Sequence, residues 1–163
     1  MKSLLLLRHA EAAAENSKNP DSERPLTKYG ESQCYILGDF FKRLAYEPDR
    51  IECSSAFRTQ QTAKLLKETA QWPGSITPYE DLYSARTEEL MAHVSLQDNN
   101  IRKLILIAHA PSLGELFAWL ISKNRDAASI FSPGTAAEIY LEIESWSEVQ
   151  SGCGAVRLIL PGM

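Results

Sequence analysis

Two histidines and two arginines stand where short apolar segments of the chain end. Arg8 and His9 follow one such segment, Arg58 follows a second, and His109 follows a third. Guanidinium groups match the geometry of phosphate oxygens and stay charged at every relevant pH. One histidine can attack phosphorus to form a covalent intermediate, while a second, protonated histidine stabilises charge on the transferring group. These residue types therefore indicate a pocket for an oxyanion, and phosphate is the natural candidate.

The elements that would position these side chains alternate along the chain. Short apolar segments predict strands, and apolar residues recurring at steps of three and four predict helices that cover them. The ends of parallel strands carry the ligand sites of open α/β sheets, so the four residues would converge if their strands are neighbours. We expect an α/β three-layer sandwich, with a mainly parallel central sheet, helices on both faces and an antiparallel edge. Strands are predicted at 3–7, 50–54, 76–79, 103–108, 136–143 and 156–160, and helices after Thr27, over 56–70, from about Thr87 and from Pro111.

Size and composition limit the classes of function. The 163 residues predict a single domain over 1–163, with 44% hydrophobic and 23% charged residues as in ordinary soluble proteins. A net charge of −4 argues against nucleic-acid and anionic-membrane partners. The apolar run of leucines before Arg8 is too short for a membrane span, and three widely spaced cysteines favour a reducing compartment. We expect a cytoplasmic monomer.

Four segments carry a resemblance that extends over nearly the whole chain. They read LRHAE at 7–11, RPLT followed by a glycine at 24–30, SSAFRTQQTA at 54–63 and IAHAP at 107–111. In order and spacing they resemble the motifs of the histidine phosphatase superfamily, which includes the phosphoglycerate mutases. The short chain, LYSA at 82–85, and the tail with SW at 145–146 and LILP at 158–161 are similar to its SixA-type branch of phosphohistidine phosphatases. The resemblance implies a phosphoglycerate mutase-like fold and no cofactor.

Carried over residue by residue, the resemblance implies a set of catalytic residues. It makes His9 the phosphorylated nucleophile and gives Arg8, Arg58 and His109 phosphate-binding roles. Arg24 is expected to contact substrate at the rim, although an arginine at that place can instead form a surface ion pair. A zinc site built from the histidines is disfavoured because two nearby guanidinium charges repel a divalent cation, so no metal is expected. The remaining histidine, His93, is assigned a structural role.

Three positions depart from the family pattern. Ser55 replaces a common proline, Ala110 replaces a common asparagine, and Ser84 stands where larger relatives carry a glutamate that acts as general acid. A leaving group of low pKa, such as the imidazole of phosphohistidine, needs less help from an acid than an alcohol does. The missing acid therefore favours a phosphoramidate substrate. Other carboxylates remain possible donors, and none enters the catalytic set: Glu11, Glu80, Asp81 and Glu88.

These observations predict a metal-independent phosphatase that hydrolyses its substrate through a phosphohistidine on His9. The expected substrate is a protein phosphohistidine, and a small phosphorylated metabolite is the alternative. A phosphomonoester phosphatase or a mutase remains open as a second enzymatic reading, although a mutase would need a larger insertion and the missing acid. A module that binds a phosphorylated ligand without turnover is the reading from a different class.

Overall fold

The strands of the protein form one mixed sheet. The computed structural model describes residues 1–121 and 125–163, and in these the strand order is β3-β2-β4-β1-β5-β6. The first four strands in this order run parallel to one another, while β5 pairs antiparallel with both β1 and β6. The strands are β1 (Lys2–Arg8), β2 (Arg50–Ser54), β3 (Ile76–Tyr79), β4 (Lys103–Ala108), β5 (Ala136–Leu141) and β6 (Gly154–Leu160).

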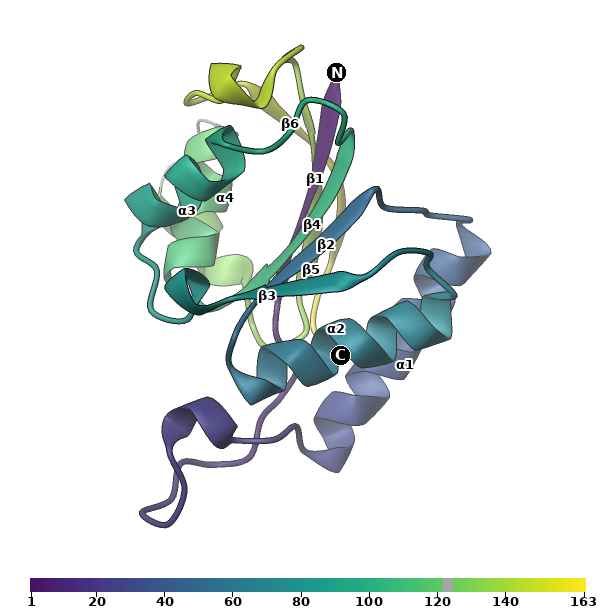
Figure 1. Ribbon diagram of the computed structural model, residues 1–163, viewed down its shortest axis with the longest axis vertical. Helices are drawn as coiled ribbons and strands as arrows, with labels where there is room; N and C mark the ends of the chain where they lie inside the picture. Colours follow the sequence, from purple (N-terminus) through teal and green to yellow (C-terminus); the bar gives the residue numbers. More distant parts are fainter. Residues whose placement is uncertain (122–124) are drawn as a thin grey trace.

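Helices cover both faces of this sheet (Figure 1). One layer contains α1 (Lys28–Arg43) and α2 (Phe57–Ala70), and the opposite layer contains α3 (Thr87–Ser95) and α4 (Ser112–Leu120). The predicted three-layer α/β sandwich with a mainly parallel sheet is confirmed. Short 3-10 turns lie between these elements at Asp21–Glu23, Glu80–Leu82, Arg125–Ile130 and Trp146–Glu148.

The two central strands supply the core on both faces. Leu4 and Leu6 of β1 pack in the layer of α3 and α4, whereas Leu5 and Leu7 pack in the layer of α1 and α2. All four leucines are at most 1% exposed. Burying each one stabilises the fold by about 1.5–3 kcal/mol relative to leaving it in water. An uninterrupted apolar run is therefore what a strand covered on both sides requires.

The last two strands form the antiparallel edge that the sequence predicts, and they include a buried charged residue. Glu138 of β5 is 1% exposed. Its carboxylate accepts hydrogen bonds from Ser3 Oγ, at 2.7 Å, and from Arg157. A helix layer covers this face as well, so the carboxylate is retained there only because a guanidinium and a hydroxyl satisfy it.

The start of α1 follows the predicted cap. The Thr27 hydroxyl accepts a hydrogen bond from the Gly30 amide, at 2.9 Å, and so satisfies one of the free N–H groups of the first turn. Gly30 is needed because a Cβ there would lie 2.1 Å from the Glu11 carbonyl oxygen. Within the described residues, no helix has both the length and the apolar character that crossing a membrane requires.

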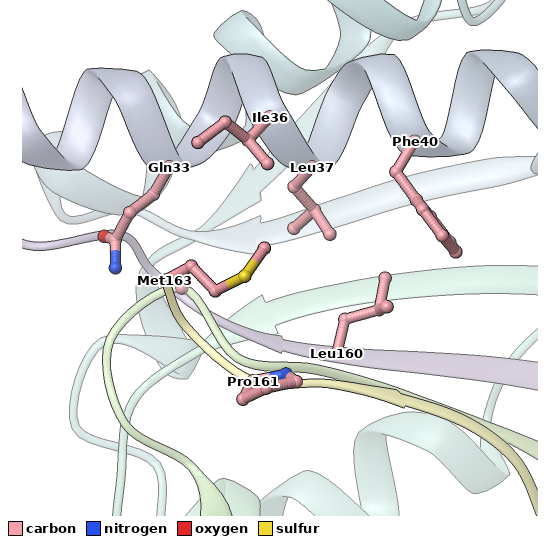
Figure 2. Close-up of a pocket in the computed structure, with 8 residues that line it drawn as sticks. Gln33, Ile36, Leu37, Phe40, Leu160, Pro161 and Met163 are labelled. Atoms are coloured by element: carbon pink, nitrogen blue, oxygen red, sulfur yellow. The ribbon is translucent and has the colours of Figure 1, made fainter.

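Gln33 of α1 joins two segments that lie next to the end of β1. Its side-chain oxygen accepts from the Glu11 amide, at 2.8 Å, and its side-chain nitrogen donates to the Pro133 carbonyl, at 3.0 Å. Figure 2 shows it at one end of a small apolar pocket between α1 and the residues that follow β6. This pocket holds about 60 Å³, far below the several hundred Å³ of typical ligand sites. Gln33 therefore serves to fix the loop after β1.

Replacing Gln33 should weaken the fold measurably. Gln33→Ala leaves the Glu11 amide and the Pro133 carbonyl without their partner, and we expect the free energy of unfolding to fall by about 1–3 kcal/mol. Urea denaturation at neutral pH would measure the loss. Ser32→Ala, an exposed neighbour on the same helix, is the control and should change stability by less than about 0.5 kcal/mol. Equal stability of both variants would contradict a clamping role for Gln33.

Candidate active site

Two adjacent parallel strands bring the two predicted histidines together. Arg8, the last residue of β1, lies in register with Ala108, the last residue of β4. His9 and His109 are the next residues of each chain segment, and their ring centroids are 5.2 Å apart. The site lies at the carboxyl ends of the strands, the lower end of the sheet in Figure 1. The predicted convergence at this edge of the sheet is confirmed.

Arg58 enters the same place from the first turn of α2. Its Nε lies 3.4 Å from Nε2 of His9, and its Nη2 lies 3.5 Å from Nδ1 of His109. Nε and Nη2 of Arg58 form one edge of its guanidinium group, and such an edge binds two carboxylate or phosphate oxygens through parallel hydrogen bonds. The donor edge of Arg58 therefore faces the space between the two imidazoles.

The ring of His9 is held in one tautomer. Its Nδ1 lies 2.7 Å from the carbonyl oxygen of Ala10, and because a carbonyl only accepts, Nδ1 must carry the proton. The lone pair is consequently on Nε2, the nitrogen that faces Arg58. The backbone carbonyl of His9 also accepts from the Gly134 amide, at 3.0 Å. Gly134 has a φ of +82°, a conformation that favours glycine. The nitrogen that carries the lone pair is thus oriented by the main chain.

Both imidazoles are neutral in this environment. Burial, with a further contribution from the Arg58 and Arg8 charges, lowers the pKa of His9 to about 4, against a smaller opposing effect of the Ala10 hydrogen bond. Burial, the nearby His9 and Arg58 lower the pKa of His109 to about 3. A positively charged site disfavours further positive charge. An anion between the rings would raise the pKa of both histidines, because negative charge favours the protonated imidazole.

Arg8 adds the second guanidinium. Its Nη1 donates to the carbonyl of Phe131, at 2.8 Å, while its Nε is buried without a hydrogen-bond partner in the described part of the chain. Burial and the neighbouring Arg58 charge lower the pKa of Arg8, although an arginine retains its charge in proteins. Two guanidinium groups close to each other form a site that favours an anion.

Ser54, at the end of β2, fixes the second histidine. Its Oγ lies 2.7 Å from Nε2 of His109 and accepts a hydrogen bond from the Ala56 amide, at 3.1 Å. Ser54 is fully buried, so these partners satisfy a hydroxyl that would otherwise be costly in the core. Ser54 belongs to the SSAFRTQQTA segment, and its contact with His109 was not predicted from the sequence.

Side chains on one face of α2 form hydrogen bonds with the long loop between β1 and α1. Arg58, Gln61 and Thr62 are spaced three and four residues apart, so they share a helix face. The Ala10 amide donates to Thr62 Oγ1, at 3.1 Å, and the Leu26 amide donates to Gln61 Oε1, at 2.8 Å. The QT pair of the motif therefore holds both ends of the loop.

Asp21, on a 3-10 turn of this loop, connects the arginines. Its carbonyl accepts from Nη1 of Arg58, at 2.9 Å, and its Oδ2 accepts from Nη2 of Arg58, at 3.2 Å. Oδ1 accepts from Nε of Arg24, at 2.8 Å, and Oδ2 also accepts from the Tyr83 hydroxyl, at 2.5 Å. The Tyr83 hydrogen bond, followed by the arginines, lowers the pKa of Asp21 to about 2. Asp21 is thus a carboxylate at neutral pH.

Arg24 lies next to the four converging residues without touching the histidines in the described contacts. It pairs with Asp21 and donates from Nη1 to the Ala13 carbonyl, at 2.7 Å, which closes the loop on itself. Its contact with substrate stays a prediction. His93 is remote from the pocket, and its Nε2 lies 2.6 Å from the buried Glu52 carboxylate. A structural role for His93 fits this pairing.

Two open grooves flank the pocket, one on each side of Tyr83, whose ring packs edge-on against His109. Glu80 lies in one groove, where it accepts from Ser55 Oγ, at 3.3 Å, and Glu88 and Ser84 lie in the other. Glu11 accepts from the Thr27 hydroxyl, at 2.8 Å, and Asp81 lines a separate hollow with His93. Among the residues that the structure describes, the carboxylate in contact with the arginines of the pocket is Asp21, which is ionised, so it is not a proton donor.

Asp21 and Tyr83 are therefore further residues of this site that the sequence analysis did not identify. Asp21 was not among the site residues singled out from the sequence, where only a surface ion pair of Arg24 was weighed. Its position three residues before Arg24 is compatible with a local ion pair, but no local signal connects it to Arg58, 37 residues away. Tyr83 belonged to a quoted motif, and the carboxylate beside it could not be found from that motif.

The sequence of the chain is similar to those of known phosphatases. The family model of the histidine phosphatase superfamily (branch 1) matches residues 4–83, a span that contains Arg8, His9 and Arg58. A phosphohistidine phosphatase SixA homolog of Haemophilus influenzae is 29% identical over 150 residues, covering 83% of this chain and 86% of the relative. Phosphohistidine phosphatase SixA of Escherichia coli is 25% identical over 119 residues, covering 72% and 73%.

Solved structures share the fold. A putative phosphohistidine phosphatase SixA from Agrobacterium tumefaciens superposes with a TM-score of 0.84 at 23% identity, covering 98% of this chain and 97% of the other. A protein histidine phosphatase SixA complexed with tungstate gives a TM-score of 0.82 at 22% identity, again over 98% and 97%. The arrangement of the sheet and helices is thus that of this group of structures.

The neutral histidines predict how stability depends on pH in the ligand-free protein. Folded-state pKa values of about 4 for His9 and about 3 for His109 lie below the unfolded value of 6.5, so the unfolded chain binds more protons between these limits. Stability should be complete above about pH 6.5 and fall as pH decreases towards 4. Urea denaturation at pH 7 and pH 5 should show a loss on the order of 1 kcal/mol per histidine.

His109→Asn is the matched variant for this measurement, since it removes one of the two groups. Its stability should change less between pH 7 and pH 5 than that of the wild type. Saturating inorganic phosphate should also reduce the loss, because a bound anion favours the protonated imidazoles. A wild-type stability that rises on acidification over this range would contradict neutral, buried histidines.

Proposed function

The chain belongs to the histidine phosphatase superfamily, and from that premise we propose that it is a phosphohistidine phosphatase whose own His9 carries the phosphoryl group during turnover. The single observation that carries the proposal is the position of His9 Nε2. This nitrogen bears the lone pair and lies 3.4 Å from a guanidinium nitrogen that can hold the phosphoryl group in line. Relatives named phosphohistidine phosphatases support the substrate class.

The guanidinium groups bind the phosphoryl oxygens. Arg58 offers Nε and Nη2 towards the two histidines, and Arg8 contributes a second positive charge from the end of β1. Phosphoryl transfer depends on positioning and on stabilising charge that spreads over three oxygens. A protein histidine phosphatase SixA of the same fold is complexed with tungstate, which is an oxyanion, and this supports an oxyanion as the ligand of this chain.

His109 is the third donor. Ser54 Oγ accepts from the Ala56 amide and lies 2.7 Å from Nε2 of His109, and the protonated ring, which a bound dianion favours, carries a second hydrogen on Nδ1. Nδ1 then faces the same oxygen as Nη2 of Arg58, and a phosphoryl oxygen between them accepts from both. A dianion at this position also raises the pKa of His109, since opposite charge favours the protonated ring.

The two chemical steps balance without a general acid. In the first step Nε2 of His9 bonds to phosphorus while the bond between phosphorus and the substrate imidazole breaks. The leaving imidazole departs as a neutral ring because its other nitrogen keeps its hydrogen. In the second step water attacks phosphorus, the bond to His9 breaks, and phosphate leaves with both hydrogens of the water. The Ala10 carbonyl accepts from Nδ1–H throughout and stabilises the positive charge on phosphorylated His9.

In both steps the bond that breaks joins phosphorus to an imidazole nitrogen, and the leaving ring needs no added proton. A phosphoramidate therefore suits the site better than an alkyl ester. An alcohol leaves as a strong base unless a donor protonates it, and Ser84 occupies the position at which larger relatives carry that acid. Asp21 does not replace it, because its pKa is about 2. The open grooves beside Tyr83 give room for the polypeptide that surrounds a phosphohistidine.

Substitution of the nucleophile tests the proposal. We expect wild-type protein to hydrolyse a phosphohistidine-bearing protein at least about a hundredfold faster than p-nitrophenyl phosphate or alkyl phosphates, and His9→Ala to lose this activity by a factor of about 10³ or more. His93→Gln is the control, since it removes an imidazole outside the pocket, and should retain activity. Rapid quenching should trap acid-labile phosphate on the wild type and none on His9→Ala.

The remaining outcomes distinguish the other readings. Hydrolysis by His9→Ala at the wild-type rate would exclude a phosphohistidine intermediate on this residue. Preference for phosphomonoesters would indicate that a carboxylate of the grooves supplies the proton. Binding of phosphate without turnover of either substrate would favour a module that recognises a phosphorylated ligand.

A further inference from the structure

We propose that Asp21 is a positioning residue for this site, which aims the donor edge of Arg58 at the phosphoryl group by holding the opposite edge of the same guanidinium. The inference rests on the proposed function of the pocket and names a residue that acts there without contacting substrate. It comes from the way in which the hydrogens of Arg58 are divided among its neighbours.

The guanidinium of Arg58 has two usable edges. Nε and Nη2 face His9 and His109, at 3.4 Å and 3.5 Å. Nη1 and Nη2 face Asp21, whose main-chain carbonyl lies at 2.9 Å and whose Oδ2 lies at 3.2 Å. Asp21 therefore occupies the outer edge with two acceptors, and the planar group can present only its other edge to the histidines.

Asp21 is itself held firmly enough to act as a support. Its Oδ2 accepts from the Tyr83 hydroxyl, at 2.5 Å, and its Oδ1 accepts from Arg24 Nε, at 2.8 Å. Arg24 is in turn anchored on the Ala13 carbonyl. Two side chains besides Arg58 thus hold this carboxylate, whose low pKa keeps it charged over the whole range in which a phosphatase assay is run.

Such a support is needed because Arg58 lies close to a like charge. Arg58 lowers the pKa of Arg8 and contributes to the low pKa of both histidines, so the site repels the group that it must retain. A long side chain also loses rotamer entropy when it is fixed. A second partner on the outer edge offsets both costs before any anion arrives.

A positioning role for Asp21 predicts a change in anion affinity opposite in sign to the change expected from its charge alone. A negative charge beside an anion site should by itself weaken anion binding, so its removal should strengthen binding. A positioning carboxylate has the reverse effect, because without it the donor edge of Arg58 is no longer aimed at the phosphoryl oxygens. The direction of the change in affinity therefore separates the two roles.

The experiment measures equilibrium binding of inorganic phosphate and of orthovanadate to full-length wild type, Asp21→Asn and Asp21→Ala, by calorimetric titration near pH 7. We expect Asp21→Ala to bind phosphate at least about tenfold more weakly, which corresponds to about 1.4 kcal/mol, with Asp21→Asn between the two. The loss should be larger for orthovanadate, which resembles the five-coordinate transition state. Glu15→Gln, an exposed change of the same charge in the same loop, should bind phosphate as the wild type does.

Tyr83→Phe adds a readout that a charge effect would not move. It keeps the ring against His109 and the carboxylate charge, and removes only the hydroxyl that holds Asp21. Positioning predicts weaker phosphate binding by a few-fold and a decrease in kcat larger than any increase in KM for a phosphohistidine-bearing protein. Asp21 lies on a half-exposed surface turn, so circular dichroism should show folded protein for every variant.

Phosphate binding to Asp21→Asn and Asp21→Ala that equals or exceeds that of the wild type would overturn the positioning role. Wild type that binds phosphate yet does not hydrolyse phosphohistidine would contradict the proposed function alone, and the affinity comparison would still decide the role of Asp21. Wild type that binds neither oxyanion at millimolar concentration would overturn both proposals.

Discussion

The structure depends on holding two guanidinium charges beside two neutral imidazoles at one edge of a sheet. Arg8 and Arg58 repel each other, and burial and their charge together hold His9 and His109 well below their usual pKa. None of these groups would stay together in a flexible chain. Pairing of β1 with β4 fixes Arg8 at the end of β1 and the two histidines that follow these strands. The rigid helix α2 places Arg58 beside them. The fold therefore holds these side chains in place against the repulsion between their charges.

Much of the polar structure outside the pocket serves that purpose. Gln33, Gln61 and Thr62 use their side chains to hold main-chain groups of the loop after β1, and Ser54 holds an imidazole. Each of these side chains satisfies a group that would be costly to leave unpaired. The helix face that contacts the loop is also the one that carries Arg58. Stability and the geometry of the site are consequently linked through the same hydrogen bonds.

The chemistry follows from what the site contains and from what it orients. A lone pair on His9 Nε2 faces the donor edge of Arg58, and the carboxylate that holds the outer edge of the same guanidinium is ionised. Such a site is suited to transfer between two imidazoles, where the leaving nitrogen needs no added proton. The match of residues 4–83 to the family model of the histidine phosphatase superfamily and the likeness to phosphohistidine phosphatases point in the same direction. In the proposed mechanism Asp21 holds the outer edge of the Arg58 guanidinium in a fixed position.

The amino-acid sequence alone determined the alternation of strands and helices, the cap at Thr27 and the residue types at the strand ends. These features depend on near neighbours in the chain, so local patterns and motifs predict them. Only the tertiary structure decided which edge of Arg58 faces the histidines, that Asp21 and Tyr83 support it, and that Glu138 is buried. Those properties arise from contacts between residues far apart in sequence, across elements whose relative placement no local pattern contains.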